Sequence, residues 1–377
     1  MGGIYLNNKR NIILFVFILI LILSGTALYA QTSPSWLSLE QGKMYFRSGA
    51  YGNALLAFED ARRSRWDEIS RMENDLILAL STPELRQFGD SLNSVEAYST
   101  DHRQDRAIRA LKELYYRYPK DELDGSVRRA LEELSRLKTY PEAEYWLGET
   151  YRAEGELGLA LNQYKKAYND RKNLETPGFE AEILYKILEI HRVRQEYQEM
   201  ENQALEILRD SGAPWTTESF MRAAMVRILE NDGINRFLIL YRYNNVQVER
   251  AYRLLGLFYY ATSRHNQAAE HLMFSFLIQS TLLIEELMRQ EFDYTFTTLD
   301  SLMRAIQRRQ DLLSYLDESE YYRILYYLGA SLYATGKLLP ARQIWNFLSG
   351  REEAGVWRNR ARNQLQNPYI ERAIELP

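Results

Sequence analysis

The chain has 377 residues, of which 47 are basic, 51 are acidic and none is cysteine, and its formal net charge is −4. The lack of cysteine excludes disulfides, thiol catalysis, thiolate metal sites and a lipid-modified N-terminal cysteine. Basic and acidic residues are mixed along the chain, and no basic stripe or lysine-rich tail indicates nucleic-acid binding.

The first thirty residues follow the order of a secretory signal. Lys9 and Arg10 precede an uncharged apolar run from Ile12 to Leu23, and the sequence Ser-Gly-Thr-Ala-Leu-Tyr-Ala follows up to Ala30, with Leu28 where a small residue is preferred. This order predicts a signal peptide over residues 1–30, with Ala30 the last residue removed. We therefore expect the protein to be exported to the periplasm or the cell envelope.

An uncleaved anchor is the alternative for the same segment. Residues 12–30 number 19, which is just enough to cross a bilayer. The protein would then be anchored in the inner membrane through residues 12–30. Membrane contact is expected only in this case, through the uncleaved N-terminal segment.

Four later stretches repeat one spacing of packing residues: a glycine, a large residue three or four places on, a turn, an alanine and further packing residues. The copies are Gly42, Tyr45, Gly49, Tyr51, Ala54, Phe58 and Ala61; Gly148, Tyr151, Gly155, Ala160, Tyr164 and Ala167; Gly256, Tyr259, Ala268, Leu272 and Ser275; and Gly329, Gly336, Ala341, Trp345 and Leu348. The third copy has Ser263 at the turn, and in the fourth the tyrosine comes one place late, at Tyr333. Small residues at these places let two helices cross closely, while Tyr and Phe fill the space beside them.

This pattern resembles the tetratricopeptide repeat, a helix-turn-helix unit that recurs about every 34 residues. The crossing glycines are 106, 108 and 73 residues apart, so weaker copies are expected between the strong ones. A single hairpin leaves an apolar face in water, so hairpins must stack. The resemblance implies an all-α, right-handed superhelical solenoid of about nine hairpins over residues 31–377.

Two weaker copies are visible. One comprises Ala107, Leu111, Leu114 and Pro119, and the other comprises Leu184, Ile187, His191, Tyr197, Ala204 and Ile207. Helix breaks are expected at Pro83, Pro119, Pro141, Pro177-Gly178 and near Gly350, because proline starts or follows a helix. If the solenoid divides, the hinge is expected at residues 211–214.

The segment Leu272–Ile284 has no charged residue but is too short and too often interrupted by polar residues to span a bilayer. It is expected to be a buried helix, with a surface for self-association or for a partner as the alternative.

No catalytic or metal-binding motif is present in the sequence. The four histidines, at positions 102, 191, 265 and 271, are not spaced as a helical metal pair. The segment Gly329–Lys337 has six residues between its glycines instead of the four of a phosphate loop, and Leu338 follows the lysine. We therefore predict no cofactor, no metal and no enzymatic activity.

A binding role is favoured by tyrosine, of which the chain has 28. In tetratricopeptide arrays the first helices line a concave groove, and positions three before, one after and four after the crossing glycine face it. These positions, as the resemblance implies, supply the predicted partner-binding residues Lys43, Phe46, Tyr145, Glu149, Arg152, Arg253, Tyr260, Tyr326 and Tyr333. Tyrosine and arginine suit interfaces because they bury a large area and keep a polar tip.

The sequence therefore predicts an exported scaffold that binds a protein or peptide in its groove. The resemblance does not extend to the family's carboxylate clamp, because Lys43, Glu149, Leu257 and Ala330 stand where the clamp has asparagine. A ligand-handling accessory subunit of an envelope transporter or assembly complex remains as the alternative.

Overall fold

A computed structural model describes residues 34–81, 135–210, 212, 219–291 and 293–371, and these residues form helices and no β-strand. The predicted all-α class is confirmed. The chain divides into two compact units, Met1–Ile183 and Leu184–Pro377, with the boundary inside helix α9 (Phe179–Val193). The signal segment, the weak copy at 107–119 and almost all of the proposed hinge at 211–214 lie outside the described residues.

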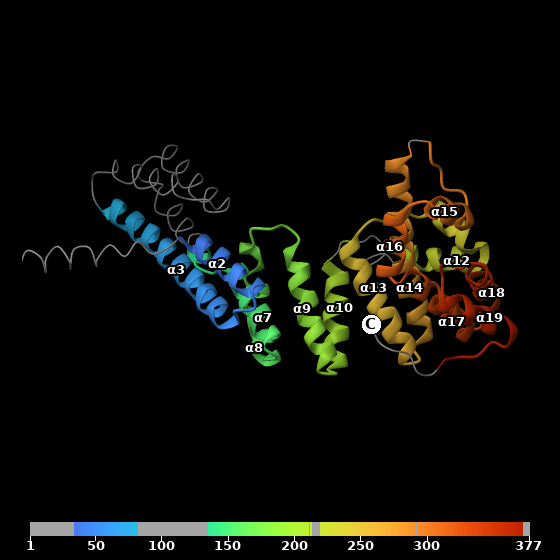
Figure 1. Ribbon diagram of the computed structural model, residues 1–377, viewed down its shortest axis with the longest axis horizontal. Helices are drawn as coiled ribbons and strands as arrows, with labels where there is room; N and C mark the ends of the chain where they lie inside the picture. Colours follow the sequence, from blue (N-terminus) through green and yellow to red (C-terminus); the bar gives the residue numbers. More distant parts are fainter. Residues whose placement is uncertain (1–33, 82–134, 211, 213–218, 292, 372–377) are drawn as a thin grey trace, which may run out of the picture. The chain divides into compact units, whose positions relative to one another are not determined.

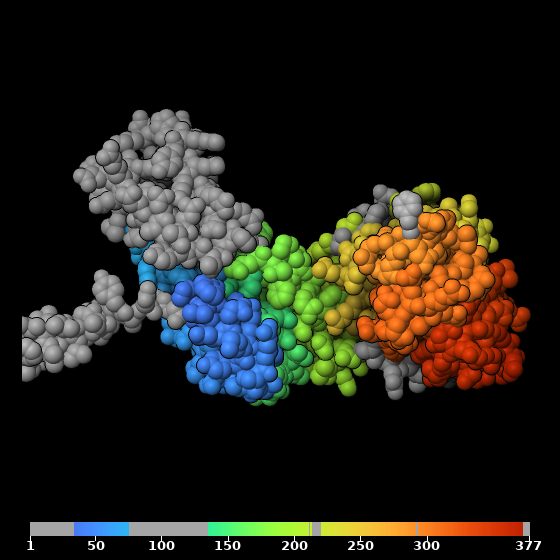
Figure 2. All heavy atoms as spheres, turned by 45° about the horizontal axis from the view of Figure 1, so that its top comes forward, coloured from blue at the N-terminus to red at the C-terminus, as the bar shows by residue number. Residues whose placement is uncertain are grey.

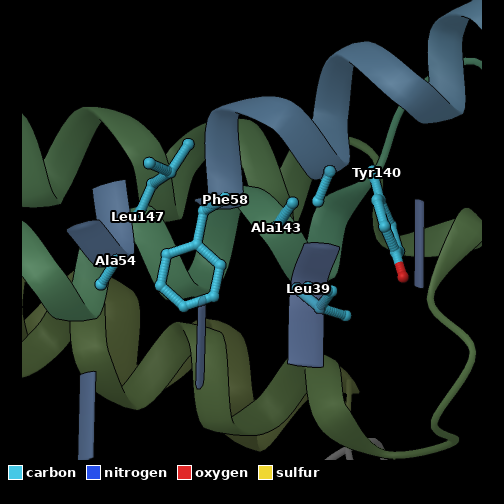
Figure 3. Packing of buried hydrophobic residues seen from close by; sticks show 7 residues of the cluster. Leu39, Ala54, Phe58, Tyr140, Ala143 and Leu147 are labelled. Carbon is cyan, nitrogen blue, oxygen red and sulfur yellow. The ribbon is translucent and has the colours of Figure 1, made fainter. Parts of the chain in front are cut away.

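The first unit contains two helix pairs and a short 3-10 turn. Its helices are α2 (Ser35–Arg47), α3 (Tyr51–Ser81), α7 (Pro141–Ala153), α8 (Leu157–Asn169) and η2 (Arg171–Asn173). Helix α3 packs against both α2 and α7, and α7 packs against α8. Figure 3 shows the core between these helices, where Phe58 lies among Leu39, Ala54 and Leu147.

The second unit contains the remaining helices. They are α10 (Tyr197–Asp210), α12 (Ser219–Leu240), α13 (Val246–Ala261), α14 (His265–Gln290), α15 (Leu299–Ile306), α16 (Gln310–Glu318), α17 (Tyr321–Ala334), α18 (Leu338–Ser349) and α19 (Val356–Gln366) (Figure 1). Helices α13, α14, α17, α18 and α19 pack in chain order, each against the next. The atoms of α14 to α19, orange to red in Figure 2, form one continuous surface in that view. None of the described helices combines the length and apolar character needed to cross a bilayer.

The four crossing glycines lie where the sequence predicted them. Each is in the first helix of a pair, and a Cβ atom built on it would collide with a side chain of the second helix. The nearest atoms would be 2.7 Å away at Gly148, 2.6 Å at Gly256 and 2.8 Å at Gly329, and Gly42 lies directly against the Phe58 ring. These glycines set how closely the paired helices approach.

We expect Gly148→Ala to destabilise the protein by about 1–3 kcal/mol, because its methyl group would overlap the buried Tyr164 ring. Gly158→Ala is the matched control: Gly158 lies in α8 with open space around it, and alanine there should be neutral or stabilising by up to about 1 kcal/mol. Urea denaturation of the full chain measures both changes. Equal midpoints for the two variants would contradict the packing role of Gly148.

The helix pairs share one turn geometry. The turn residues Gly49, Gly155 and Gly336 have φ of 77°, 83° and 80°, in the left-handed region that favours glycine. Ser263 (φ 60°) takes this conformation in the third copy, and Gln195 (φ 59°) takes it between α9 and α10. In every case the next residue's N–H donates to the carbonyl five residues before it, which closes the first helix. The weak copy over 184–207 therefore has the same helix-turn-helix layout.

Helix α14 contains the uncharged segment Leu272–Ile284. Its side chains are almost all fully buried, and α14 packs on α13 and α17 of the same chain. The expected buried helix is confirmed, and this burial removes the segment as a surface for self-association. After α14 come only the short helices α15 and α16, so no further pair of full-length helices fills the interval before Gly329.

His271, on α14, packs against two tyrosine rings of α13. The His271 ring lies 4.9 Å from the Tyr259 ring and 5.7 Å from the Tyr252 ring, and its Nδ1 donates to the Gln267 carbonyl over 2.8 Å. Burial lowers the pKa of His271 to about 4, and the nearby Arg222 also lowers it. The folded protein therefore holds His271 neutral at pH values where the unfolded chain would protonate it.

We expect the melting temperature to fall as the pH is lowered from about 7 to about 4.5. At pH values between the ordinary histidine pKa and about 4, the unfolded state binds a proton that folded His271 does not. The free energy of unfolding therefore decreases as the pH is lowered through this range. Burial also lowers the pKa of His265, which acts in the same direction. His271→Gln should flatten this pH dependence while lowering stability at neutral pH, as calorimetry can measure. An unchanged pH dependence would show that His271 is not the titrating group.

Candidate partner-binding surface

In the first unit, the predicted residues of α7 are engaged inside the protein. Tyr145 is buried, with its ring 4.7 Å from the Phe179 ring and 5.7 Å from the Tyr164 ring. Glu149 is also buried; it accepts a hydrogen bond from the Tyr164 hydroxyl and pairs with Arg152 at 3.0 Å. Tyr145 and Glu149 therefore act as packing residues here, and only Arg152 is partly exposed.

The predicted residues of α2 are also engaged. Lys43 pairs with Glu40 at 2.7 Å, and its ammonium lies 5.8 Å from the centre of the Trp146 ring. Phe46 packs against Trp146 and Tyr51, with ring centres 5.5 and 5.6 Å away. The structure brings Lys43 and Phe46 together at Trp146, a residue that the repeat pattern did not single out.

In the second unit, three predicted tyrosines meet one short segment of the same chain. After α19 the chain turns back, and residues 368–371 lie against α17 (Figure 1). The Tyr326 hydroxyl donates to Glu371 Oε1 at 2.5 Å, and the Tyr333 hydroxyl donates to the Pro368 carbonyl at 3.4 Å. Tyr260 packs beside them, and its hydroxyl is buried near Glu371.

The Glu371 carboxylate is the centre of this contact, and its side chain is only 11% exposed. It accepts hydrogen bonds from Tyr326 and from Tyr327, the latter at 3.1 Å, and Arg360 lies 3.5 Å away. Gln364 holds the segment from the other side: it donates to the Tyr369 carbonyl and accepts from the Tyr369 N–H, at 3.0 and 2.8 Å. These residues together form what we call the Glu371 site.

The electrostatics of the Glu371 site keep its donors protonated. Burial, reinforced by the negative charge of Glu371, raises the pKa values of Tyr260, Tyr326 and Tyr327 above that of free tyrosine. A neutral phenol is a hydrogen-bond donor, and two donors with a guanidinium match the acceptor oxygens of a carboxylate. The site is therefore built to hold a carboxylate.

Arg253 lies elsewhere in this unit, above a buried carboxylate. Its guanidinium pairs with Glu320 at 2.8 Å and approaches Glu249 at 3.4 Å. Glu249 also accepts hydrogen bonds from Ser275 and Gln279, and burial raises its pKa in spite of Arg253. Replacing Arg253 would leave buried Glu249 without its cation, so this arginine has a structural role.

Arg253 also lines a cavity of about 540 Å³ on the first helices α9 and α13. Its other lining residues are Leu188, Glu189, Arg192, Arg250, Leu254 and Glu320. The Arg250 guanidinium lies 4.5 Å from the centre of the Tyr185 ring, which fixes its position. Neither Arg192 nor Arg250 forms an ion pair with a described residue, so both charges are available to a ligand. We call this the arginine cavity.

Arg192 occupies a groove position that the sequence analysis did not identify. Counting back seven residues from the turn, as from Gly155 to Gly148, leads from Gln195 to the crossing residue Leu188. The groove positions of α9 are then Tyr185, Glu189 and Arg192, the same residue types as Tyr145, Glu149 and Arg152 in α7. The missing glycine hid this register, and the turn spacing was the signal that could have revealed it.

A second cavity, of about 590 Å³, adjoins the Glu371 site and shares Tyr327 and Arg360 with it. Its walls include Trp357 and Tyr322, and Arg360 lies over the Trp357 ring at 4.9 Å. Residues 367–371 do not line it. Both cavities therefore combine aromatic or aliphatic walls with arginine, which suits ligands that carry both apolar and acidic groups.

Among the described residues, no three His, Cys, Asp or Glu side chains are grouped so that they could hold a metal ion. The first helices carry tyrosine donors and arginines instead. This arrangement can bind and orient acidic or amphipathic chains.

Comparison with known proteins gives relatives but no family. No protein-family model matches the chain. It is 23% identical over 333 residues to an uncharacterized protein of Treponema pallidum, covering 88% of this chain and 89% of the relative. It is 21% identical over 237 residues to an uncharacterized protein of Borreliella burgdorferi, covering 58% of this chain and 73% of the relative. The similarity to the Treponema protein thus extends over most of both chains.

Proposed function

We propose that the chain is an exported, non-catalytic scaffold of tetratricopeptide-like hairpins that holds a segment of a partner protein on its first helices. The solenoid of about nine hairpins belongs to this proposal. In support of it, α3 packs on α7, α10 on α13 and α14 on α17, so that the second helix of one pair covers the first helix of the next. Nucleic acid has no place in the proposal, and neither has a cofactor.

The strongest support is the Glu371 site. Tyr260, Tyr326 and Tyr333 were predicted as groove residues from repeat positions alone. Tyr326 and Tyr333 donate hydrogen bonds to the segment 368–371, and Tyr260 lies near Glu371. A peptide partner would be held in the same way, by hydrogen bonds from side chains on the helices. The arginine cavity adds Arg192 and Arg250, on neighbouring first helices, neither of which forms an ion pair with a residue that the structure describes.

We expect a photoreactive phenylalanine analogue at position 192 or 250 to crosslink the full chain to a partner protein in its native host. Both positions line the arginine cavity without an ion pair, so substitution should leave the fold intact. The adduct should migrate as one discrete species of higher mass on a denaturing gel. Mass spectrometry of the adduct would identify the partner.

The matched control is position 227, an exposed arginine on α12 that lines neither cavity. Crosslinking at 192 and 250 but not at 227 supports the proposal. No protein adduct at any of the three positions, with all variants folded, would overturn it.

Export is proposed from the sequence of residues 1–30. We expect the mature chain to begin at or near Gln31 and to stay in the supernatant after membranes are sedimented. N-terminal sequencing of the native protein measures this directly. Full-length protein that needs detergent for release would instead favour the inner-membrane anchor through residues 12–30.

A ligand-handling accessory subunit is the second candidate. The two cavities in the second unit, about 540 and 590 Å³, fall within the size range of small-molecule sites. Native mass spectrometry of protein purified from its host would show a bound small molecule in this case.

A further inference from the structure

We propose that the Glu371 site takes an extended acidic segment of a partner protein, and that residues 368–371 are an intramolecular competitor for it. This inference rests on the proposed function and names the chemistry of the partner: an extended segment that presents a carboxylate to Tyr326 and Tyr327 and its backbone to Gln364. The chain's own Tyr369, Ile370 and Glu371 supply the template.

The segment is held by a few polar contacts, and two of its side chains are largely exposed. Tyr369 is 46% exposed and Ile370 is 44% exposed, whereas the Glu371 side chain is 11% exposed. Little apolar area holds the segment, so its binding depends on the carboxylate and on the Gln364 hydrogen bonds. A segment held in this way can leave without disturbing the helices beneath it.

The site that residues 368–371 would vacate contains strong hydrogen-bond donors. Tyr326 is fully buried and donates its proton to Glu371, because the bond from Gln364 to the Tyr326 oxygen already uses an acceptor position. Without Glu371, the Tyr326 and Tyr327 hydroxyls would lose the acceptor that they have in the structure, which is unfavourable for donors in a largely apolar surrounding. The vacated site therefore favours a replacement carboxylate over solvent.

The linkage of the segment to α19 makes it an effective competitor. Residues 368–371 follow closely on the end of α19 at Gln366, and a short linker gives an effective concentration of about millimolar. A partner with weaker contacts than the segment would be excluded. A partner that also fills the adjacent 590 Å³ cavity, beside Trp357 and Arg360, would gain contacts that the segment lacks.

The test uses the full chain and a labelled peptide with the sequence of residues 366–373, Gln-Asn-Pro-Tyr-Ile-Glu-Arg-Ala, with both ends capped. Glu371→Lys should release the internal segment, since a lysine cannot accept from Tyr326 and Tyr327. Fluorescence anisotropy should then show peptide binding at least about tenfold tighter than to the wild-type chain. A peptide with glutamine in place of its glutamate should bind weakly to the variant.

Two further variants separate the site from charge effects. Glu352→Lys makes the same charge change at a side chain that is 86% exposed, and it should leave peptide binding at the wild-type level. Adding Tyr326→Phe and Tyr327→Phe to Glu371→Lys should abolish the gain. Equal peptide binding by wild type and folded Glu371→Lys would overturn the proposal.

Hydrogen exchange of the wild-type chain gives a readout that does not depend on any variant folding. The Tyr369 amide is bonded to Gln364 Oε1, so excess peptide should accelerate its exchange. Unchanged exchange at saturating peptide also contradicts the proposal. A partner crosslinked at positions 192 and 250, together with no peptide binding, would refute only the Glu371 inference and leave the scaffold function standing.

Discussion

The close approach of two helices at a glycine is the constraint on which the described structure depends. At Gly148 and Gly329, an aromatic side chain of the second helix lies where a Cβ atom would be. Because the helices approach this closely, Tyr164 and Trp345 are completely buried and fill the whole gap. At Gly256 the smaller Leu272 takes the same place, and its backbone nitrogen is 3.1 Å from the hypothetical Cβ.

The sequence predicted the fold where a residue type has one physical role. Pro141 begins α7, Ser349 ends α18, and the four glycines lie at crossings. It was less informative where a special residue is replaced by an ordinary one. Gln195 takes the left-handed turn without being glycine, and Leu188 occupies a crossing position. Such positions are fixed by the turn's hydrogen bonds, which hold the whole loop and not one residue.

The sequence predicted which tyrosines lie close together at the candidate site, but it did not predict which of the proposed groove residues are buried. The spacing rule placed Tyr260, Tyr326 and Tyr333 on one surface, and all three meet residues 368–371 there. It could not foresee that Tyr145 would be buried under Phe179, because that contact comes from the next helix and not from the repeat itself. Glu371 carried no signal either, since it belongs to no repeat. A distant segment can cover a surface that local periodicity describes as open.

Tyrosine and glutamate form a recurring pair that explains why this segment in particular can be exchanged. The Tyr164 hydroxyl donates to Glu149 and the Tyr259 hydroxyl donates to Glu201, as Tyr326 does to Glu371. A tyrosine between helices brings its hydroxyl into a region with little water, where it needs an acceptor. Glu149 and Glu201 are supplied by helices whose burial holds them in place. Glu371 is supplied by a short exposed segment, so the same chemical need is met by a group that another chain could replace.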